Sequence, residues 1–171
     1  MNMEDQYMTK IMQGPFLWEY LNETPYTIRH TMAEYFLANE PLVVDVGTYK
    51  IPLKVNGELI SIDPLNTFPG GYNKDVKIFL EQVNPINFSL SCLGLAIQGP
   101  KEQWDAFLEL FKRSRMAVIE YSRDAHNHSD FDKIEELCKI KKVYFKAYID
   151  MPDVEVEGIR PYPKRKFLVF K

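Results

Sequence analysis

The sequence predicts an α/β fold, and three patterns support this prediction. Short apolar runs rich in β-branched residues, such as residues 42–46, alternate along the chain with segments in which apolar residues recur at helical spacing. The apolar runs are continuous, which is typical of strands buried on both faces of a parallel sheet. Turn formers separate the two kinds of segment, and this alternation of strand and helix favours an α/β sheet.

The chain is expected to begin its sheet only after an N-terminal helical region. A helix is predicted over residues 26–37, because Thr24-Pro25 precedes the segment and its apolar residues recur at intervals of three and four. A proline then breaks the chain before residues 42–46, which form the first buried strand. We therefore expect residues 1–40 to pack as a helical segment on a single domain that spans residues 1–171.

The segment after the first strand is less regular. Pro52 argues against a central strand at this point, and Asn56-Gly57 predicts a tight hairpin turn into a second strand at residues 58–62. Turn formers dominate residues 64–71, which are expected to form a loop at the same edge of the sheet as Gly47.

The rest of the chain continues the alternation of helix and strand. Helices are predicted where apolar residues keep to one helical face, and strands where apolar or aromatic residues run together. In chain order these are a helix at 74–82, a strand at 88–97 that turns near Gly94, a helix from Pro100 to residue 113, a strand at 116–121, a helix at 131–140, and strands at 142–149 and 166–170. The last two strands are expected to form an antiparallel hairpin with a long connection.

The composition argues against several classes of function. The chain has 171 residues, of which 46% are hydrophobic, and 21 basic against 24 acidic residues, so no global field favours nucleic acid or an anionic membrane. No apolar stretch approaches the roughly 20 residues that span a bilayer, and the N-terminus lacks a secretory signal, so a soluble, cytoplasmic protein is expected. Cys92 and Cys138 are expected to be buried thiols rather than part of a disulfide framework or a zinc site.

Two acidic residues end the first two predicted strands. Asp45 lies beside Gly47, and Asp63 lies beside Pro64. The carboxyl ends of parallel strands share one edge of the sheet, where ligands of open α/β folds bind. An acid at the end of the second strand is well placed to accept hydrogen bonds from two ribose hydroxyls, so a nucleotide-type pocket is predicted. The alternative is that each acid caps the turn or helix that follows it.

Four segments, taken in order, resemble the class I S-adenosylmethionine-dependent methyltransferases. They are Val43-Val44-Asp45-Val46-Gly47, Ser61-Ile62-Asp63-Pro64, Phe88-Ser89-Leu90-Ser91-Cys92-Leu93-Gly94-Leu95 and Met116-Ala117-Val118-Ile119-Glu120-Tyr121. The resemblance covers residues 42–171. It implies a Rossmann-like, mostly parallel sheet with an antiparallel C-terminal hairpin and helices on both faces, S-adenosylmethionine as the cofactor, and an acceptor that the sequence does not identify.

The resemblance also implies a set of cofactor-binding residues, namely Asp45, Gly47, Thr48, Asp63, Pro64, Ser91, Leu93 and Gly94. By position, the first strand and its turn approach the methionine part, Asp63 takes the ribose hydroxyls, and residues 91–94 lie beside the transferred methyl group. In-line methyl transfer needs little beyond positioning. If the acceptor must lose a proton, Glu120 is the nearest candidate base, and Tyr121, Asp124 and His126 are alternatives.

The sequence departs from the family pattern in three places. The first turn carries only Gly47, the predicted hairpin at Asn56-Gly57 replaces the family's first long helix, and the interval between Asp63 and Phe88 is too short for a complete helix, strand and helix. A third strand is therefore expected to be missing and the pocket to be reduced. These departures leave open an alternative function, a catalytically inactive methyltransferase-fold protein that serves as a binding or assembly subunit.

The histidines suggest a further alternative, a metal-dependent hydrolase. Residues 124–130 contain His126 and His128 and resemble the start of the metal motif of metallo-β-lactamase-like hydrolases. Phe131 occupies the position where that motif requires another histidine, and only His30 remains elsewhere. A polar loop is favoured, and no metal is expected.

Basic and aromatic residues are interleaved in the C-terminal third of the chain. The basic residues are Lys139, Lys141, Lys142, Lys146, Lys164, Arg165 and Lys166, and the aromatic residues are Tyr144, Phe145, Tyr148, Tyr162 and Phe167. On a surface they could hold single-stranded nucleic acid through charge and stacking. Charged turns flanking buried aromatic strands produce the same pattern and are the favoured interpretation, so nucleic acid is not an expected partner. A homo- or hetero-oligomer remains open.

Overall fold

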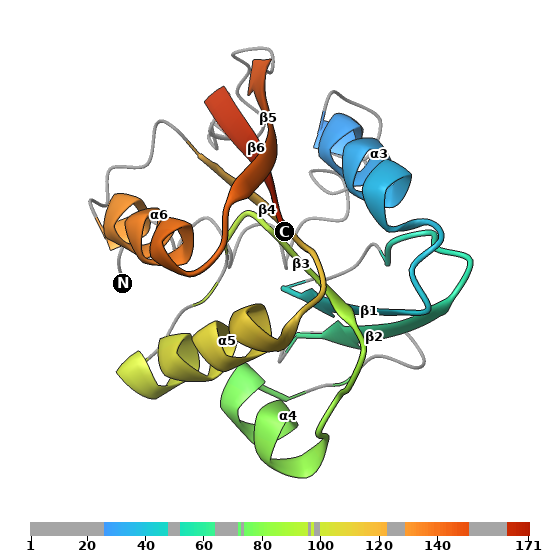
Figure 1. Cartoon of the computed structure of the whole chain (residues 1–171), viewed down its shortest axis with the longest axis vertical. Helices are drawn as coiled ribbons and strands as arrows, with labels where there is room; N and C mark the ends of the chain where they lie inside the picture. The colour runs from blue at the N-terminus through green and yellow to red at the C-terminus, as the bar shows by residue number, and fades with distance from the viewer. Residues whose placement is uncertain are drawn as a thin grey trace, which may run out of the picture.

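The computed structural model describes residues 26–47, 52–63, 72, 74–95, 97, 100–122, 129–150 and 164–171, which form a six-stranded sheet flanked by helices (Figure 1). The helices are α3 (Tyr26–Leu37), α4 (Val76–Gln82), α5 (Lys101–Arg113) and α6 (Ser129–Ile140). The strands are β1 (Leu42–Val46), β2 (Glu58–Ile62), β3 (Ser89–Leu93), β4 (Ala117–Ser122), β5 (Val143–Asp150) and β6 (Lys164–Phe170). These elements confirm the predicted order of helices and strands.

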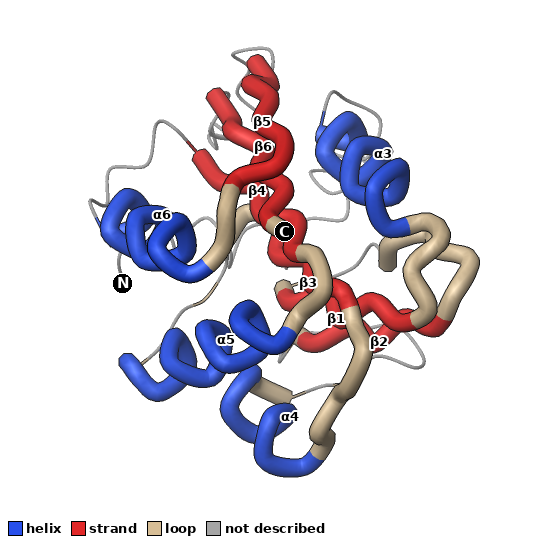
Figure 2. Tube along the Cα trace, viewed as in Figure 1, coloured by secondary structure: helices blue, strands red, loops and turns tan. Residues whose placement is uncertain are grey.

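The sheet has the strand order β2-β1-β3-β4-β6-β5. The first four strands in this order pair in parallel, whereas β6 pairs antiparallel with both β4 and β5. Figure 2 shows the six strands in red, with the helices in blue around them. The prediction of a mostly parallel sheet with an antiparallel C-terminal hairpin is therefore confirmed. The parallel strands all point their carboxyl ends toward one edge of the sheet, and this edge is where the candidate site lies.

Helices cover both faces of the sheet, as Figure 1 shows. On one face, α3 contributes Ala33 and Leu37 to an apolar cluster that also contains residues of β1, β4 and β6. On the other face, α4, α5 and α6 supply the larger cluster, with Phe107 and Phe111 of α5 fully buried. Burial of each such ring contributes about 1.5–3 kcal/mol to folding.

The predicted hairpin at Asn56-Gly57 is wrong, because β1 and β2 pair in parallel. Residues 52–57 are neither helix nor strand, and Gly57 passes close to the backbone that precedes β1. A Cβ atom at Gly57 would lie 2.2 Å from the carbonyl oxygen of Glu40 and 2.6 Å from that of Pro41. The glycine is therefore required by this close approach and not by a hairpin turn.

The described residues between β2 and α4 contain one strand-like contact. Tyr72 forms an isolated parallel bridge with Ile62, in which its N–H donates to the Ser61 carbonyl (2.7 Å) and its carbonyl accepts from Asp63 (3.1 Å). Residues 64–71 lie outside the described part of the chain. Among the described residues of this interval, Tyr72 pairs with β2, and the expected loss of a strand here stays a prediction.

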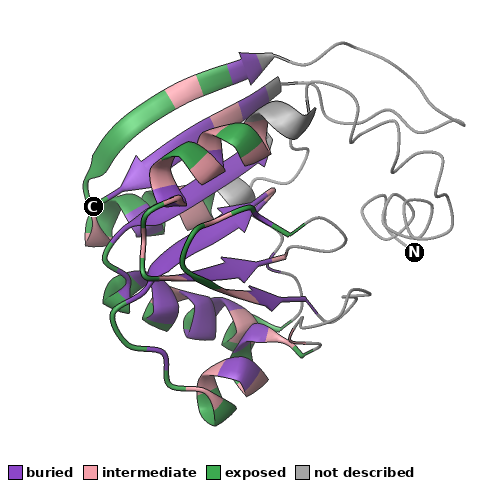
Figure 3. Ribbon diagram, turned by 90° about the vertical axis from the view of Figure 1, so that its right-hand side faces the viewer, coloured by how far each residue is buried: buried purple, intermediate pink, exposed green. Residues whose placement is uncertain are grey.

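Two expectations about burial are wrong. Cys92 is buried, as predicted, but Cys138 on α6 is exposed; neither of them forms a disulfide. The aromatic residues of β5 are not buried either, since Tyr144 is 63% exposed and Tyr148 is 58% exposed. The reason is the place of β5 in the sheet: an edge strand has a neighbour on one side only. In Figure 3 this outer strand is mostly drawn as exposed, whereas the central strands are drawn as buried.

Within the described ranges, we find no helix with both the length and the apolar composition that crossing a bilayer requires.

Candidate functional site at the carboxyl edge of the sheet

The strand register aligns three polar residues across the carboxyl ends of β2, β1 and β3. Asp45 of β1 lies directly between Ser61 of β2 and Ser91 of β3. Partners in a parallel register present their side chains to the same face of the sheet, here the face that α3 covers. Asp63 follows two residues after Ser61, so both predicted acids lie near one another at this edge, as the sequence predicted.

Both acids are nearly buried by the protein itself. Asp45 is 3% exposed and Asp63 is 7% exposed, and each interacts with other groups of the chain. The hydroxyl groups of Ser89 and Ser91 are also buried, and neither has a hydrogen-bond partner among the described residues. A buried hydroxyl without a partner is uncommon, so the first and middle residues of β3 retain polar capacity that the described chain does not satisfy.

Two glycines adopt left-handed backbone conformations where β1 and β3 end. Gly47 has φ +79° and Gly94 has φ +82°, which non-glycine residues adopt only with strain. The N–H of Gly47 donates to the Ile62 carbonyl (2.8 Å), so this amide extends the β1–β2 pairing. The turn after β3 continues through Leu95, which also has a positive φ of 46°. Glycine at both turns lets the backbone change direction without a side chain at this edge.

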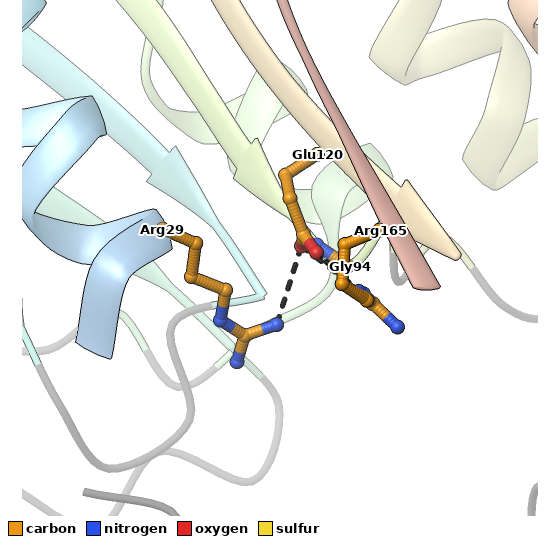
Figure 4. A network of polar contacts seen from close by, with 4 residues as sticks. All are labelled: Arg29, Gly94, Glu120 and Arg165. Atoms are coloured by element: carbon orange, nitrogen blue, oxygen red, sulfur yellow. Dashed lines mark hydrogen bonds and ion pairs between the residues drawn. The ribbon is translucent and has the colours of Figure 1, made fainter. Parts of the chain in front are cut away.

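Glu120, at the carboxyl end of β4, is the centre of a buried polar network (Figure 4). Its carboxylate accepts hydrogen bonds from Arg29 of α3 (3.2 Å), from both Nε and Nη2 of Arg165 of β6 (the latter 3.1 Å), and from the backbone N–H of Gly94 (2.7 Å). Glu120 is fully buried and Arg165 is nearly so. The network therefore joins α3, the turn after β3, β4 and β6 around one carboxylate.

The electrostatics of this network fix Glu120 as an anion. Burial alone would raise the pKa of Glu120, but the charges of Arg165 and Arg29, together with the hydrogen bonds from Arg165 and Gly94, lower it to about 2. A carboxylate held in this way is a poor proton acceptor at neutral pH. Its contacts therefore speak against the role of base that the sequence suggested and point to a role in holding the Gly94 turn.

Sequence reasoning did not find the two arginines of this network. Arg29 and Glu120 are 91 residues apart in the chain, and Arg165 and Glu120 are 45 apart. Arg165 was included only as part of a basic run. No local period links such positions, so the only available signal was an acidic residue inside an otherwise apolar strand, because a buried charge requires partners.

Several predicted residues lie outside the described part of the chain. Two of them, Thr48 and Pro64, are predicted cofactor-binding residues. The others are Asp124 and His126, named as alternative bases, and His128 of the alternative metal motif. Tyr121 is described and is buried in β4. Leu93 ends β3 and packs into the cluster beneath α3.

Comparison with known proteins identifies the fold. No protein-family model and no curated protein matches the sequence. The structure is similar to magnesium protoporphyrin IX methyltransferase of Synechocystis PCC 6803 with bound S-adenosylmethionine, at 13% identity and a TM-score of 0.57, over 94% of this chain and 88% of that one. The same enzyme with bound S-adenosylhomocysteine gives 14% identity and a TM-score of 0.55, over 99% and 94%.

The structure is also similar to that of a second protein. The TehB-like S-adenosylmethionine-dependent methyltransferase of Corynebacterium glutamicum is 12% identical, with a TM-score of 0.55 over 90% of this chain and 92% of that one. This protein therefore has a class I methyltransferase-like fold, in agreement with the resemblance found in the sequence. At these identities the similarity establishes the fold, and function has to be argued from the site.

Proposed function

We propose that the protein is a methyltransferase that binds S-adenosylmethionine at the carboxyl edge of β1, β2 and β3. The observation that carries the proposal is the register that aligns Asp45 with Ser61 and Ser91 on adjacent parallel strands, with Asp63 two residues beyond Ser61. Ligands of open α/β sheets bind at this edge. The fold, shared with one enzyme solved with S-adenosylmethionine and with S-adenosylhomocysteine, supports the same cofactor.

The described residues fit this cofactor by their chemistry. Asp63 would accept hydrogen bonds from the ribose hydroxyls, and Asp45, with Gly47, would approach the methionine part, where a carboxylate suits an ammonium group. The unsatisfied hydroxyl of Ser91 supplies a further donor or acceptor beside the end of β3. Because both carboxylates are nearly buried, we expect binding to displace the protein groups that cover them.

In this proposal the protein acts by positioning. S-adenosylmethionine supplies an electrophilic methyl group on a sulfonium, so aligning the acceptor provides much of the rate. Glu120 contributes indirectly: its carboxylate accepts from the N–H of Gly94, the residue that the resemblance places beside the methyl group. We also propose a cytoplasmic location, since Cys92 and Cys138 form no disulfide. The acceptor is a small molecule or another macromolecule.

Calorimetry with S-adenosylmethionine and S-adenosylhomocysteine tests the proposal. We expect binding to the intact protein and a weakening of about tenfold or more in Asp63→Asn, because hydrogen bonds to a charged group contribute about 1.5–3 kcal/mol. Asp105→Asn on α5 is the matched control, since its side chain is 55% exposed in an ion pair at the surface, and affinity should not change.

The opposite result is also informative. No heat at millimolar ligand, from a protein that still unfolds cooperatively, would reject cofactor binding. That outcome would favour the alternative of an inactive methyltransferase-fold subunit, for which Asp63→Asn should leave partner binding intact.

A further inference from the structure

A second surface of the molecule lies on the outer strand β5, on the face of the sheet that α6 covers. A groove of about 390 Å³ separates this strand from α6. Ile134 and Cys138 of α6 form one wall, and residues of β5 and β6 form the other, including Tyr144, Lys146, Lys166 and Leu168. The groove does not include the residues of the candidate cofactor site.

Exposed rings and positive charge occur together in the groove, at Tyr144, Lys146 and Lys166, and beside it, at Tyr148 and Lys171. Tyr144 and Tyr148 are more than half exposed, and each has a lysine over its ring: Lys171 Nζ lies 4.1 Å from the Tyr144 centroid, and Lys166 Nζ lies 5.4 Å from the Tyr148 centroid. Lys146 lies between the two tyrosines along the strand and is exposed. Of the described residues that line the groove, none is acidic.

The two tyrosines of β5, each with a lysine over its ring, form two similar units along the strand. Tyr144 and Tyr148 are four residues apart on β5, and the strand has a register irregularity between Val143 and Phe145, at the Tyr144 end. Each tyrosine is paired with a lysine, so a flat ring and a cation occur together twice along one line. Single-stranded nucleic acid presents the complementary pattern, with bases that stack on rings and phosphates that attract cations.

The position of β5 favours an extended ligand. Among the described strands it is an edge strand that pairs with β6, and four of its residues are among the exposed large hydrophobic side chains of the described chain: Val143, Tyr144, Phe145 and Tyr148. An exposed apolar edge of this kind marks an interaction site. The lysines give it a charge that an anionic ligand would complement, although the protein as a whole carries a net charge of −3.

We propose that this β5 surface, defined by Tyr144, Lys146, Tyr148, Lys166 and Lys171, binds single-stranded nucleic acid. Stacking on the two tyrosines gives affinity for unpaired bases, and the lysines neutralise phosphates. A duplex binds less well, because its bases are already stacked and paired. The inference goes beyond methyl transfer and does not depend on it.

The test uses the intact protein and a fluorescent oligothymidylate of about 12 nucleotides, with binding followed by anisotropy. We expect binding at low salt and a loss of roughly tenfold or more in affinity in the double variant Tyr144→Ala/Tyr148→Ala. Tyr35→Ala is the matched control, because Tyr35 is 81% exposed on α3, across the sheet from this surface, and affinity should be unchanged. Thermal unfolding of each variant confirms that it is folded.

The salt dependence of the affinity distinguishes the contribution of the lysines from that of the tyrosine rings. Lys146→Gln and Lys166→Gln should each reduce the slope of log affinity against log salt by about 0.7, the value for one phosphate contact on a single strand. Lys112→Gln, an exposed lysine on α5, should leave the slope unchanged. The tyrosine variant should lower affinity with little change in slope, since stacking releases no counterions.

Three results would overturn the proposal. The first is no binding of the oligonucleotide at about 100 μM protein and low salt. The second is equal binding of poly-glutamate with the same dependence on the tyrosines, which would identify an acidic protein as the partner. The third is a fall in sedimentation coefficient in the tyrosine variant without an effect on oligonucleotide binding, which would identify a second copy of this chain.

Discussion

The carboxyl end of β4 buries a charged side chain, whereas the outer strand β5 exposes aromatic side chains to solvent. Glu120 on β4 is charged yet fully buried, with Arg29, Arg165 and the Gly94 amide around it. Tyr144 on β5 is aromatic yet 63% exposed. β4 has strands on both sides and helices on both faces, whereas β5 has one neighbour among the strands that the structure describes. Position in the sheet, and not residue type, therefore decides which groups are satisfied within the chain and which are available to a ligand.

The largest expected effect comes from removing the charge of Glu120. Glu120→Gln removes the carboxylate that pairs with the guanidinium groups of Arg29 and Arg165, and breaking a buried ion pair in this way lowers the free energy of unfolding by about 3–5 kcal/mol. Urea denaturation measures the change. Glu109→Gln, an exposed residue of α5, is the control and should stay within about 0.5 kcal/mol. A loss below about 1 kcal/mol for Glu120→Gln would contradict the buried network.

Substituting alanine for an aromatic residue on β6 and on β5 compares a buried position with an exposed one. Phe167 of β6 is fully buried, so Phe167→Ala should lower the free energy of unfolding by about 3–5 kcal/mol through loss of burial and creation of a cavity. Tyr144→Ala on the neighbouring strand should change it by less than about 1 kcal/mol. If the two substitutions had equal effects on the urea midpoint, β5 would not be the exposed surface described above.

The pH dependence of stability follows from the pKa of Glu120. Its pKa in the folded protein, about 2, lies below its ordinary value of 4.5, so the stabilisation is complete above 4.5 and is lost as the pH falls toward 2. The linked loss is on the order of 3 kcal/mol. Carboxyl NMR titration should give a Glu120 midpoint near 2, and unfolding measured from pH 5 downward should show the falling stability. A midpoint near 4.5 would show that the arginines do not hold this carboxylate.

The smallest expected effect is that of Arg29→Met. Arg29 is more exposed than Arg165 and donates to Glu120 from Nη1, whereas Arg165 donates from two nitrogens, so the loss of Arg29 should lower stability by about 1–2 kcal/mol. The pKa of Glu120 should rise at the same time, because the charge of Arg29 helps to lower it. Arg115→Met removes a more exposed ion pair with Glu40 and should change stability by less than about 1 kcal/mol, with no change in the pKa of Glu120.

Much of the fold was predictable because its signals are local. The helix at Tyr26–Leu37 has the bounds predicted from its spacing, and the helix predicted to begin at Pro100 is α5, which Pro100 precedes as the N-cap residue. The buried strands were recognised from continuous apolar runs. Gly57 gave a false signal for a hairpin, since a glycine next to asparagine looks the same whether a turn or a nearby carbonyl requires it.

The candidate site was predictable only in part. Asp45 and Asp63 were found because each ends a recognisable strand, and parallel strands bring such ends together. Their cofactor-binding role stays a prediction. The partners of Glu120 were not found, because an ion pair between distant residues leaves no periodic trace in either segment.

The sequence by itself determined where helices and strands form, that the first strands run in parallel, and that two acids end at one edge of the sheet. Only the tertiary structure decided that Glu120 is an anion held by Arg29 and Arg165, and that the tyrosines of β5 face solvent. The physical reason is that secondary structure follows from neighbours along the chain, whereas burial and charge pairing depend on which distant segments come to lie beside each other.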